Sequence, residues 1–232
     1  MTDATETLQP ADKKQKTAAG KERGRGQQQP KARKPHPVLE KLFELYPALF
    51  GARFLPLKRG VYEELLARHP DAFKAEDLKV AMGLHARSTR YLEAVAAGQP
   101  RHDLDGQVVE PVAPEHVHHA ILELFRRRQG RNSEQDLGAQ LRKRIVAAIE
   151  ASGLPREEYA ALVRSARDTA ANAALDDALA ELATQAARRE ALLRAFEASG
   201  KSEAEFADMY GMTHSDVART LKRARQDKSP TA

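Results

Sequence analysis

The spacing of apolar residues between positions 53 and 106 constrains the fold of this chain most, because it follows the period of an α-helix. The residues that would share the buried face of the first helix are Leu57, Val61, Leu65 and Leu66. Pro70 ends that run, since proline cannot continue a helix. Lys58 and Arg59 stand at the start of this predicted helix. As single basic residues on a helix, they are expected to be solvated charges.

Two more helices are predicted in the same stretch. The second covers about residues 75–84, with Leu78 and Met82 facing inward and Lys79 outside that apolar stripe. Ser88 is a candidate N-cap of the third helix, because its hydroxyl can accept a hydrogen bond from an otherwise unpaired amide of the first turn. The third helix would end at the next glycine.

An Asp-Gly pair at positions 105 and 106 separates two short extended runs. This favours a β-hairpin, because both residues of a tight turn need positive φ. The surface of the stretch would carry the basic residues Arg53, Lys58, Arg59, Lys74, Lys79, Arg87, Arg90 and Arg101. Positive charge of this density attracts phosphates. Tyr91 would offer a stacking platform or, alternatively, pack in the core with its hydroxyl at the rim.

Three pieces of sequence, PLKRGVYEEL, STRYLEAV and RHDLDG, occur in this order within the stretch. Taken together, they resemble the core of the ProQ/FinO family of bacterial RNA-binding proteins and RNA chaperones, over about residues 36–128. The resemblance implies a compact helical domain with a β-hairpin, whose concave face binds RNA. It also implies a preferred target, which is a stem-loop that ends in a 3′ single-stranded tail, such as an intrinsic terminator.

The resemblance further implies which residues contact RNA. The lysine of the PLK motif is Lys58, the tyrosine of the RYL motif is Tyr91, and the arginine before DLDG is Arg101. Lys79 takes the place of a basic residue that is commonly arginine in the family. The other predicted RNA-binding residues are Arg53, Arg59, Lys74, Arg87, Ser88 and Arg90. No catalytic or metal-binding residue is predicted.

The chain departs from the family pattern in three places. The family often has Ser or Thr as the cap of the second helix, where this chain has Lys74. Gly83 and Ala96 stand where a basic residue is frequent in the family. We therefore expect the affinity or the range of targets to differ from those of relatives.

Composition limits the class of protein. The chain has 232 residues and a net charge of +5, which favours a nucleic-acid partner. Cysteine is absent, which excludes disulfides, thiol catalysis and cysteine-ligated zinc. No apolar run approaches the roughly 20 residues of a membrane span, and the N-terminus lacks the apolar core of a secretory signal. The expectation is a cytoplasmic protein with neither a cofactor nor a membrane partner.

The composition also divides the chain. Residues 1–35 are rich in Lys, Gln, Gly and Ala and are predicted to be a disordered basic tail. Such a tail would either raise RNA affinity as a flexible arm or serve as a solubilising segment. Residues 36–130 would form the ProQ/FinO-like RNA-binding domain, and residues 131–226 an α-helical C-terminal region with two related units. Residues 227–232 are predicted to be a second disordered tail.

The sequence EHVHH, at residues 115–119, raises the question of a metal site. It lies on a helix that is predicted to begin at about Glu115 and to carry three arginines in its last turn. Only His116 and His119 would share a face of that helix, and no carboxylate is spaced to complete a site. The three histidines are therefore predicted to be ordinary surface residues.

An internal repeat marks the C-terminal region. The sequence AIEASGLPREEYAALV around Gly153 recurs as AFEASGKSEAEFADMY around Gly200, 47 residues later, with Tyr159 matching Phe206. A period of this size predicts two copies of one helical unit that pack together. The segment from 164 to 189 between them is predicted to be one long helix.

The second copy also has the spacing of a helix-turn-helix. Ala207, Gly211 and Val217 fit that pattern, and Thr213 with Asp216 can form a capping box. The helix that follows carries Arg219, Lys222, Arg223 and Arg225. On a recognition helix these residues would reach DNA, whereas near a helix C-terminus they would simply complement the dipole.

The fold predicted from these features is mostly α: a compact ProQ/FinO-like helical domain with a small β-hairpin, followed by an α-helical C-terminal region. The predicted function is a non-enzymatic RNA-binding protein or RNA chaperone. It would bind structured small regulatory RNAs, terminator hairpins and mRNA 3′ ends for post-transcriptional regulation. The alternative is a DNA-binding regulator that uses the C-terminal helix-turn-helix. No nucleophile–base pair, phosphate-binding loop or metal set points to an enzyme.

Overall fold

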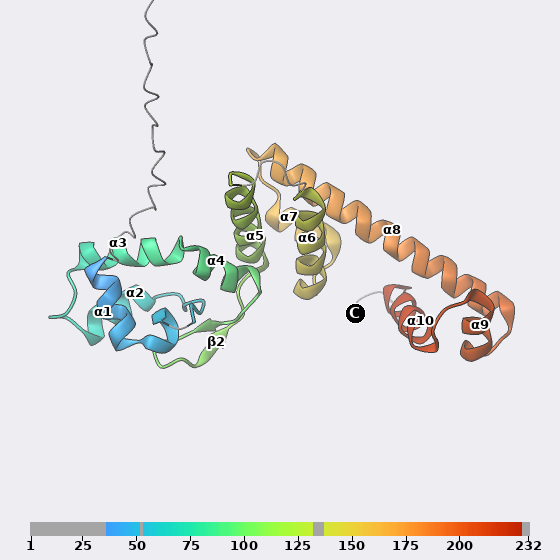
Figure 1. Ribbon diagram of the computed structural model, residues 1–232, viewed down its shortest axis with the longest axis horizontal. Helices are drawn as coiled ribbons and strands as arrows, with labels where there is room; N and C mark the ends of the chain where they lie inside the picture. The colour runs from blue at the N-terminus through green and yellow to red at the C-terminus, as the bar shows by residue number, and fades with distance from the viewer. Residues whose placement is uncertain (1–35, 52, 132–136, 229–232) are drawn as a thin grey trace, which may run out of the picture. The chain divides into compact units, whose positions relative to one another are not determined.

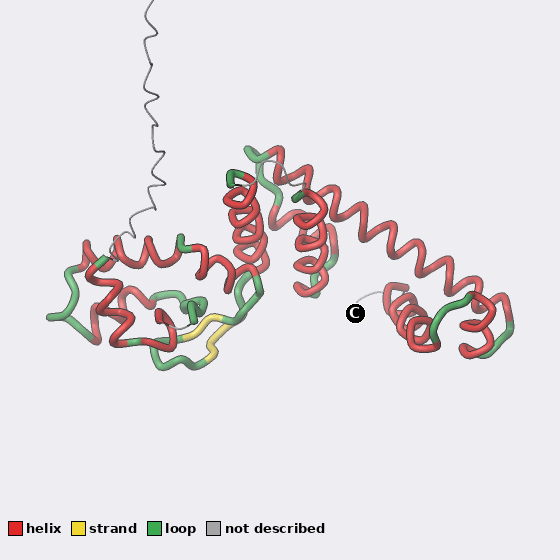
Figure 2. The backbone as a smooth tube through the Cα atoms, in the orientation of Figure 1, coloured by secondary structure: helices red, strands yellow, loops and turns green. Residues whose placement is uncertain are grey.

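The computed structural model describes residues 36–51, 53–131 and 137–228, which are mostly α-helical with one two-stranded sheet (Figures 1 and 2). This confirms the predicted fold class. The elements in chain order are α1 (Pro37–Leu45), the π-helix η1 (Pro47–Gly51), α2 (Val61–Arg68), α3 (Ala75–Ala86), α4 (Thr89–Ala96), β1 (Arg101–His102), β2 (Val108–Glu110), α5 (Pro114–Gln129), α6 (Gly138–Ser152), α7 (Arg156–Val163), α8 (Thr169–Ser199), α9 (Glu203–Tyr210) and α10 (His214–Lys228). The predicted tail at residues 1–35 lies outside the described residues, as do residues 229–232 of the second tail.

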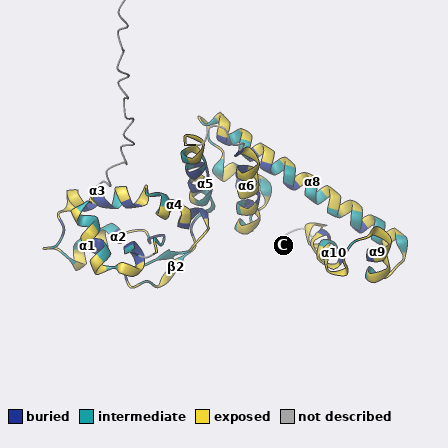
Figure 3. Ribbon diagram, viewed as in Figure 1, coloured by how far each residue is buried: buried dark blue, intermediate teal, exposed yellow. Residues whose placement is uncertain are grey.

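The first hydrophobic core joins α1, η1, α2 and α3. Among its fully buried members are Leu42, Phe50, Leu65 and Leu78. Figure 3 shows buried residues in dark blue along the ribbon. α1 ends before Pro47, because proline has no amide hydrogen to continue the helix. This core positions α3, which carries Lys79, with Lys74 and Arg87 at its two ends.

α2 begins at Val61, so the prediction that Leu57 lies on this helix is wrong. The backbone before α2 pairs instead with β1: the Lys58 amide donates to the His102 carbonyl at 2.8 Å, and the His102 amide donates to the Pro56 carbonyl at 2.7 Å. Leu57 is still buried, but as part of this extended segment. Lys58 and Arg59 therefore lie in the turn before α2 and not on the helix.

α3 and α4 follow the sequence prediction closely. In α3, Leu78 is buried, Met82 is half-buried and Lys79 is exposed. Ser88 caps α4, with its hydroxyl accepting a hydrogen bond from the Tyr91 amide at 3.2 Å. Lys74 occupies the N-cap position of α3 and makes no capping hydrogen bond through its side chain, in line with the absence of Ser or Thr there.

The predicted hairpin is confirmed, but its turn differs from the prediction. β1 and β2 pair antiparallel, and residues 104–106 form a loop closed by a hydrogen bond from the Gly106 amide to the Asp103 carbonyl at 3.1 Å. The Asp103 carboxylate accepts from the amides of Asp105 and Gln107 at 3.0 and 2.8 Å. Gly106 has φ of 77°, at the end of a loop that also buries Leu104 in the first core. Asp105 and Gly106 are thus not a two-residue turn, because burial of Leu104 requires the longer loop.

The second hydrophobic core contains residues from α4, α5, α6, α7 and α8. Tyr159 of α7 is fully buried in it, and its hydroxyl lies 3.2 Å from Nδ1 of His118 on α5. The prediction that His118 is a surface residue is therefore wrong: the face of α5 that carries it packs against α7. Among the described residues, no group of His, Asp and Glu is arranged to hold a metal ion.

The two copies of the sequence repeat share α8. Each copy consists of a helix that ends at a glycine in the left-handed conformation, Gly153 or Gly200, followed by a short helix and a longer one. Tyr159 belongs to the second core, whereas its counterpart Phe206 belongs to a third core made by α8, α9 and α10. The apolar faces of the two copies thus pack on α8 in separate cores, and the Arg223–Glu150 ion pair at 3.5 Å joins one copy to the other. The long helix predicted between them is α8, and it extends ten residues beyond position 189.

α10 continues to Lys228, two residues into the segment predicted to be the second tail. No helix in the described part of the chain has both the length and the apolar character needed to cross a bilayer.

Candidate functional site

Two residues of the predicted RNA-binding set hold one short piece of backbone. The Tyr91 hydroxyl accepts a hydrogen bond from the Leu57 amide at 3.2 Å, and the Arg101 guanidinium donates to the Leu57 carbonyl at 2.8 Å. Since Leu57 immediately precedes Lys58, these bonds fix the segment that presents the Lys58 side chain. Three motifs that lie far apart in the sequence therefore meet at one place.

Lys58 takes part in a network of charges. Its ammonium lies 2.7 Å from the Glu64 carboxylate, which Arg68 also contacts at 2.7 Å. Arg68 in turn donates two hydrogen bonds to Asp105, both at 2.9 Å, and these lower the pKa of Asp105. A phosphate that binds Lys58 would therefore compete with the Glu64 carboxylate for the lysine ammonium.

Arg101 is largely enclosed, with 14% of its side chain exposed. Besides the Leu57 carbonyl, it contacts Glu110 at 3.5 Å and His116 at 3.4 Å. Arg59 lies 3.8 Å from Glu110 and is far more exposed. The geometry gives Arg101 a positioning role for the Lys58 segment, and its direct contact with RNA stays a prediction.

A second group of basic residues lies on or next to α3. Lys74, Lys79 and Arg87 are exposed, and none forms an ion pair with a carboxylate of the described residues. The Arg87 guanidinium lies so close to Gly83 that a Cβ atom there would be 3.3 Å from it. Gly83 stands where a basic residue is frequent in the family. Arg87, four residues further along the chain, thus supplies a cation at this position.

Arg53 and Arg90 line a third part of the site, a hollow of about 570 Å³ beside β1. The Arg90 guanidinium stacks over the ring of Phe54, 4.4 Å from the ring centroid. Gln99 and His102 also border this hollow. A cation, an aromatic face and polar groups together suit an unpaired nucleotide, since bases stack on aromatic rings and on guanidinium groups.

His85 connects these parts through ring contacts that no sequence motif indicates. Its ring centroid lies 4.7 Å from that of Phe54 and 5.0 Å from that of Tyr91. Burial lowers the pKa of His85 to about 4, so the ring is neutral at pH 7. Sequence reasoning missed both Phe54 and His85; the aromatic residue beside Arg53 in RFLPLK was the available signal for Phe54.

The predicted site residues thus fall into groups with different surroundings. Lys58, Arg59, Tyr91 and Arg101 gather around the Leu57 backbone. Arg53 and Arg90 border the hollow with Phe54, whereas Lys74, Lys79 and Arg87 lie along α3. Ser88 serves as the cap of α4.

The C-terminal helices have the geometry of the predicted helix-turn-helix. Ala207 and Val217 are buried, and the Asp216 amide donates to the Thr213 hydroxyl at 3.1 Å. The arginines of α10 are paired with carboxylates: Arg219 with Asp216 at 2.5 Å, Arg223 with Glu150 and Asp227 at 3.5 Å, and Arg225 with Glu203 at 3.5 Å. These ion pairs reduce the positive charge that α10 could offer to DNA.

Residues 32–137 match the ProQ/FINO family, which confirms the resemblance predicted from the sequence. The RNA chaperone ProQ of Shewanella frigidimarina is 40% identical over 91 residues, which are 38% of this chain and 45% of that protein. The RNA chaperone ProQ of Shewanella oneidensis is 39% identical over 87 residues, which are 36% of this chain and 41% of that protein. The chain therefore spans less than half the length of these curated relatives.

Among solved structures, a FinO-like RNA chaperone from Neisseria meningitidis is similar to part of the chain. Its sequence identity is 30% and the TM-score is 0.33. The similarity covers 36% of this chain and 85% of the other.

Proposed function

Through residues 32–137 the chain belongs to the ProQ/FinO family, and on this basis we propose that it is a non-enzymatic, cytoplasmic RNA chaperone. Its ligands would be structured RNAs, namely small regulatory RNAs, terminator hairpins and mRNA 3′ ends. One observation carries the proposal: Tyr91 and Arg101 both bind the backbone of Leu57 and so position Lys58. The three motifs of the family resemblance thus serve one surface.

The basic groups are suited to the phosphates of an RNA stem. Lys58 and Arg59 lie before α2, while Lys74, Lys79 and Arg87 lie along α3. Each lysine or arginine that neutralises a phosphate releases a bound counterion, which makes affinity depend on salt. The grooves of an RNA duplex offer side chains little readable sequence, so recognition would depend on the shape of the stem and on its end.

The hollow beside β1 is suited to the unpaired 3′ tail. Stacking of one base on an aromatic or guanidinium face contributes about 1–3 kcal/mol without demanding a particular sequence. Phe54 and Arg90 provide such faces. Tyr91, whose hydroxyl binds the Leu57 backbone, follows Arg90 in the chain, so the proposed tail contact would lie next to the Lys58 segment.

Replacing Lys58 and Lys79 together by alanine is expected to weaken binding of a tailed terminator hairpin about tenfold or more. The salt dependence should also fall, by about one counterion for each lysine removed. Lys222→Ala is the control, since this exposed lysine on α10 lies outside the proposed site. Fluorescence anisotropy at several salt concentrations measures both quantities. Unchanged affinity in the Lys58/Lys79 variant, with folding verified by circular dichroism, would remove the proposal.

Duplex DNA binding by α9 and α10 is the second candidate, and it rests on the helix-turn-helix geometry. The charge pairs of Arg219, Arg223 and Arg225 argue against it, because these groups would have to exchange carboxylates for phosphates. This alternative predicts that the full chain binds a specific DNA duplex and that Lys222→Ala abolishes this binding. The RNA proposal predicts that Lys222→Ala has no effect on ligand binding.

A further inference from the structure

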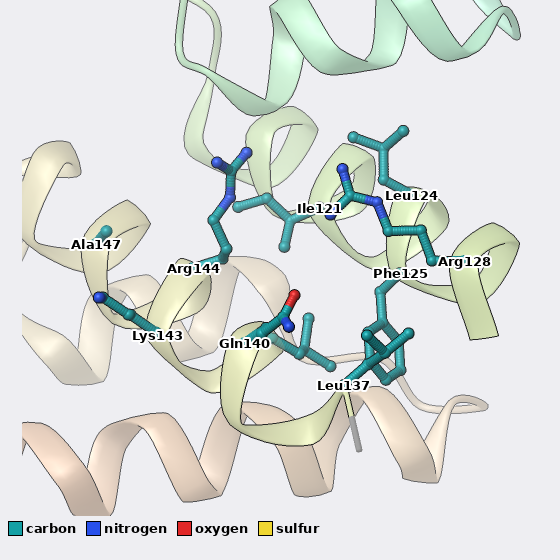
Figure 4. Close-up of a pocket in the computed structure, with 10 residues that line it drawn as sticks. Ile121, Leu124, Phe125, Arg128, Leu137, Gln140, Lys143, Arg144 and Ala147 are labelled. Carbon is teal, nitrogen blue, oxygen red and sulfur yellow. The ribbon is translucent and has the colours of Figure 1, made fainter. Parts of the chain in front are cut away.

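A groove between α5 and α6 has an apolar floor and lies outside the residues assigned to RNA binding (Figure 4). Its volume is about 420 Å³. From α5, the groove is lined by Ile121, Leu124 and Phe125. Its other side is lined by Leu141 of α6 and by Leu137, the residue just before α6. Such a surface gains free energy when an apolar side chain covers it.

Cations border this floor. Arg128, Lys143 and Arg144 line the groove and are exposed, and none is paired with a carboxylate among the described residues. Figure 4 shows the guanidinium groups of Arg128 and Arg144 on either side of Ile121. A phosphate could approach this rim, but it would leave the apolar floor uncovered. The combination fits a protein segment that carries large apolar side chains next to carboxylates.

The chain itself contains a helix of that kind. On α9, Met209 is 52% exposed and Tyr210 is 50% exposed. Glu205 and Asp208 are exposed as well, and Glu205, Asp208 and Met209 have the spacing that places them on one face of a helix. The opposite face of α9 is buried in the third core through Phe206 and Ala207, and the Tyr210 ring lies on that side, 4.5 Å from the ring of Phe206. α9 therefore turns an acidic and apolar face to solvent.

We propose that α9 of one copy of this chain docks in the α5–α6 groove of a second copy. Met209 would cover the apolar floor, with Asp208 facing the rim cations. Two copies can exchange α9 reciprocally, which closes the assembly as a symmetric dimer with two identical contacts. The inference does not depend on the proposed RNA function.

α8 is too long for α9 to reach the groove of its own chain, so the partner groove belongs to a second copy. Leu182 is the last residue of α8 in the second core, and α8 continues to Ser199 before α9 begins. At 1.5 Å per residue, this places the start of α9 about 25 Å further along the helix axis. α9 could therefore reach the groove of its own chain only if α8 unfolded. A contact by one short helix is small, so we expect a micromolar dissociation constant for the dimer.

Charge reversal tests the contact in the full chain without RNA. One variant combines Arg128→Glu with Arg144→Glu, and the other combines Ala204→Lys with Asp208→Lys, which leaves the capping box of Ser202 and Glu205 intact. In each variant alone, groove and α9 carry charges of the same sign, and self-association should weaken about tenfold or more. Mixing the two variants should restore a dimer, because each groove then faces an α9 of opposite sign. Arg142→Glu on the exposed side of α6 is the matched control and should dimerise like the unmodified chain.

Sedimentation velocity over a wide range of concentrations reads out the assembly. The proposal fails if the unmodified chain stays monomeric into the high micromolar range, or if the mixture of variants forms no heterodimer. It also fails if the arginine variant loses affinity for hairpin RNA while its self-association is unchanged, which would make the rim an RNA-binding surface instead.

Discussion

Acidification from pH 7 to pH 4 is expected to lower the free energy of unfolding by about 3 kcal/mol for each of two buried histidines. His85 is 2% exposed and His118 is 3% exposed. Burial lowers the pKa of each from 6.5 to about 4, and the charge of His119 adds to the effect on His118. In this range the unfolded chain binds protons that the folded chain does not. The stability that the two neutral histidines contribute is therefore complete above 6.5, the pKa of histidine in the unfolded chain. It is lost progressively as the pH falls towards 4, their pKa in the folded chain.

Urea unfolding at intervals between these pH values measures the effect. His85→Phe is the sharpest comparison, because another aromatic ring can replace the imidazole between Phe50 and Phe54 without a titrating group. This variant should lose about half of the pH dependence between 6.5 and 4. Asp105 and Asp168 have lowered pKa values, so their contributions are lost at lower pH than those of the histidines. A stability that is flat across this window, or identical in the two proteins, would contradict the account.

Tyr159→Ala is expected to cost about 4 kcal/mol of stability, the typical penalty for removing a fully buried aromatic side chain. Tyr159 is completely enclosed in the second core, and its removal also leaves His118 without its hydrogen-bonding partner. Tyr159→Phe keeps the ring and loses the hydroxyl, which should cost about 1–2 kcal/mol.

Tyr210→Ala provides the control, since half of this side chain is exposed and its loss should cost less than about 1 kcal/mol. Because the second core includes residues of α4 and α5 as well as α6 to α8, these elements should unfold together when Tyr159 is replaced. Chemical denaturation followed by circular dichroism checks this. Equal costs for Tyr159→Ala and Tyr210→Ala would show that the second core does not hold these helices together.

The helices could be predicted because the period of apolar residues encodes which face is buried. α3 and α4 follow directly from Leu78 and from the cap at Ser88. The pairing of Leu57 with His102 could not be predicted in this way, because the two residues lie far apart in the sequence and nothing local marks either as a partner. The sharing of α8 by the two copies could not be predicted either, because the sequence of a long helix does not say which elements will cover its apolar face.

The site shows a similar division. The motifs identified Lys58, Tyr91 and Arg101, but their meeting at the Leu57 backbone is a tertiary feature. His85 was missed because a histidine inside an apolar helix pattern has no signal of its own. The direct RNA contacts of the site residues remain predictions, as do the domain boundaries.

The central claim is that this chain recognises the tailed end of an RNA hairpin. The most direct measurement compares three ligands of the full chain at low salt: a terminator hairpin with a 3′ single-stranded tail, the same hairpin without its tail, and a DNA duplex of the stem sequence. The account predicts that the tailed hairpin binds about tenfold more tightly than the flush one, as stacking of one or two bases would provide. DNA should bind most weakly. Equal affinity for the two hairpins, or a preference for the DNA duplex, would contradict the account.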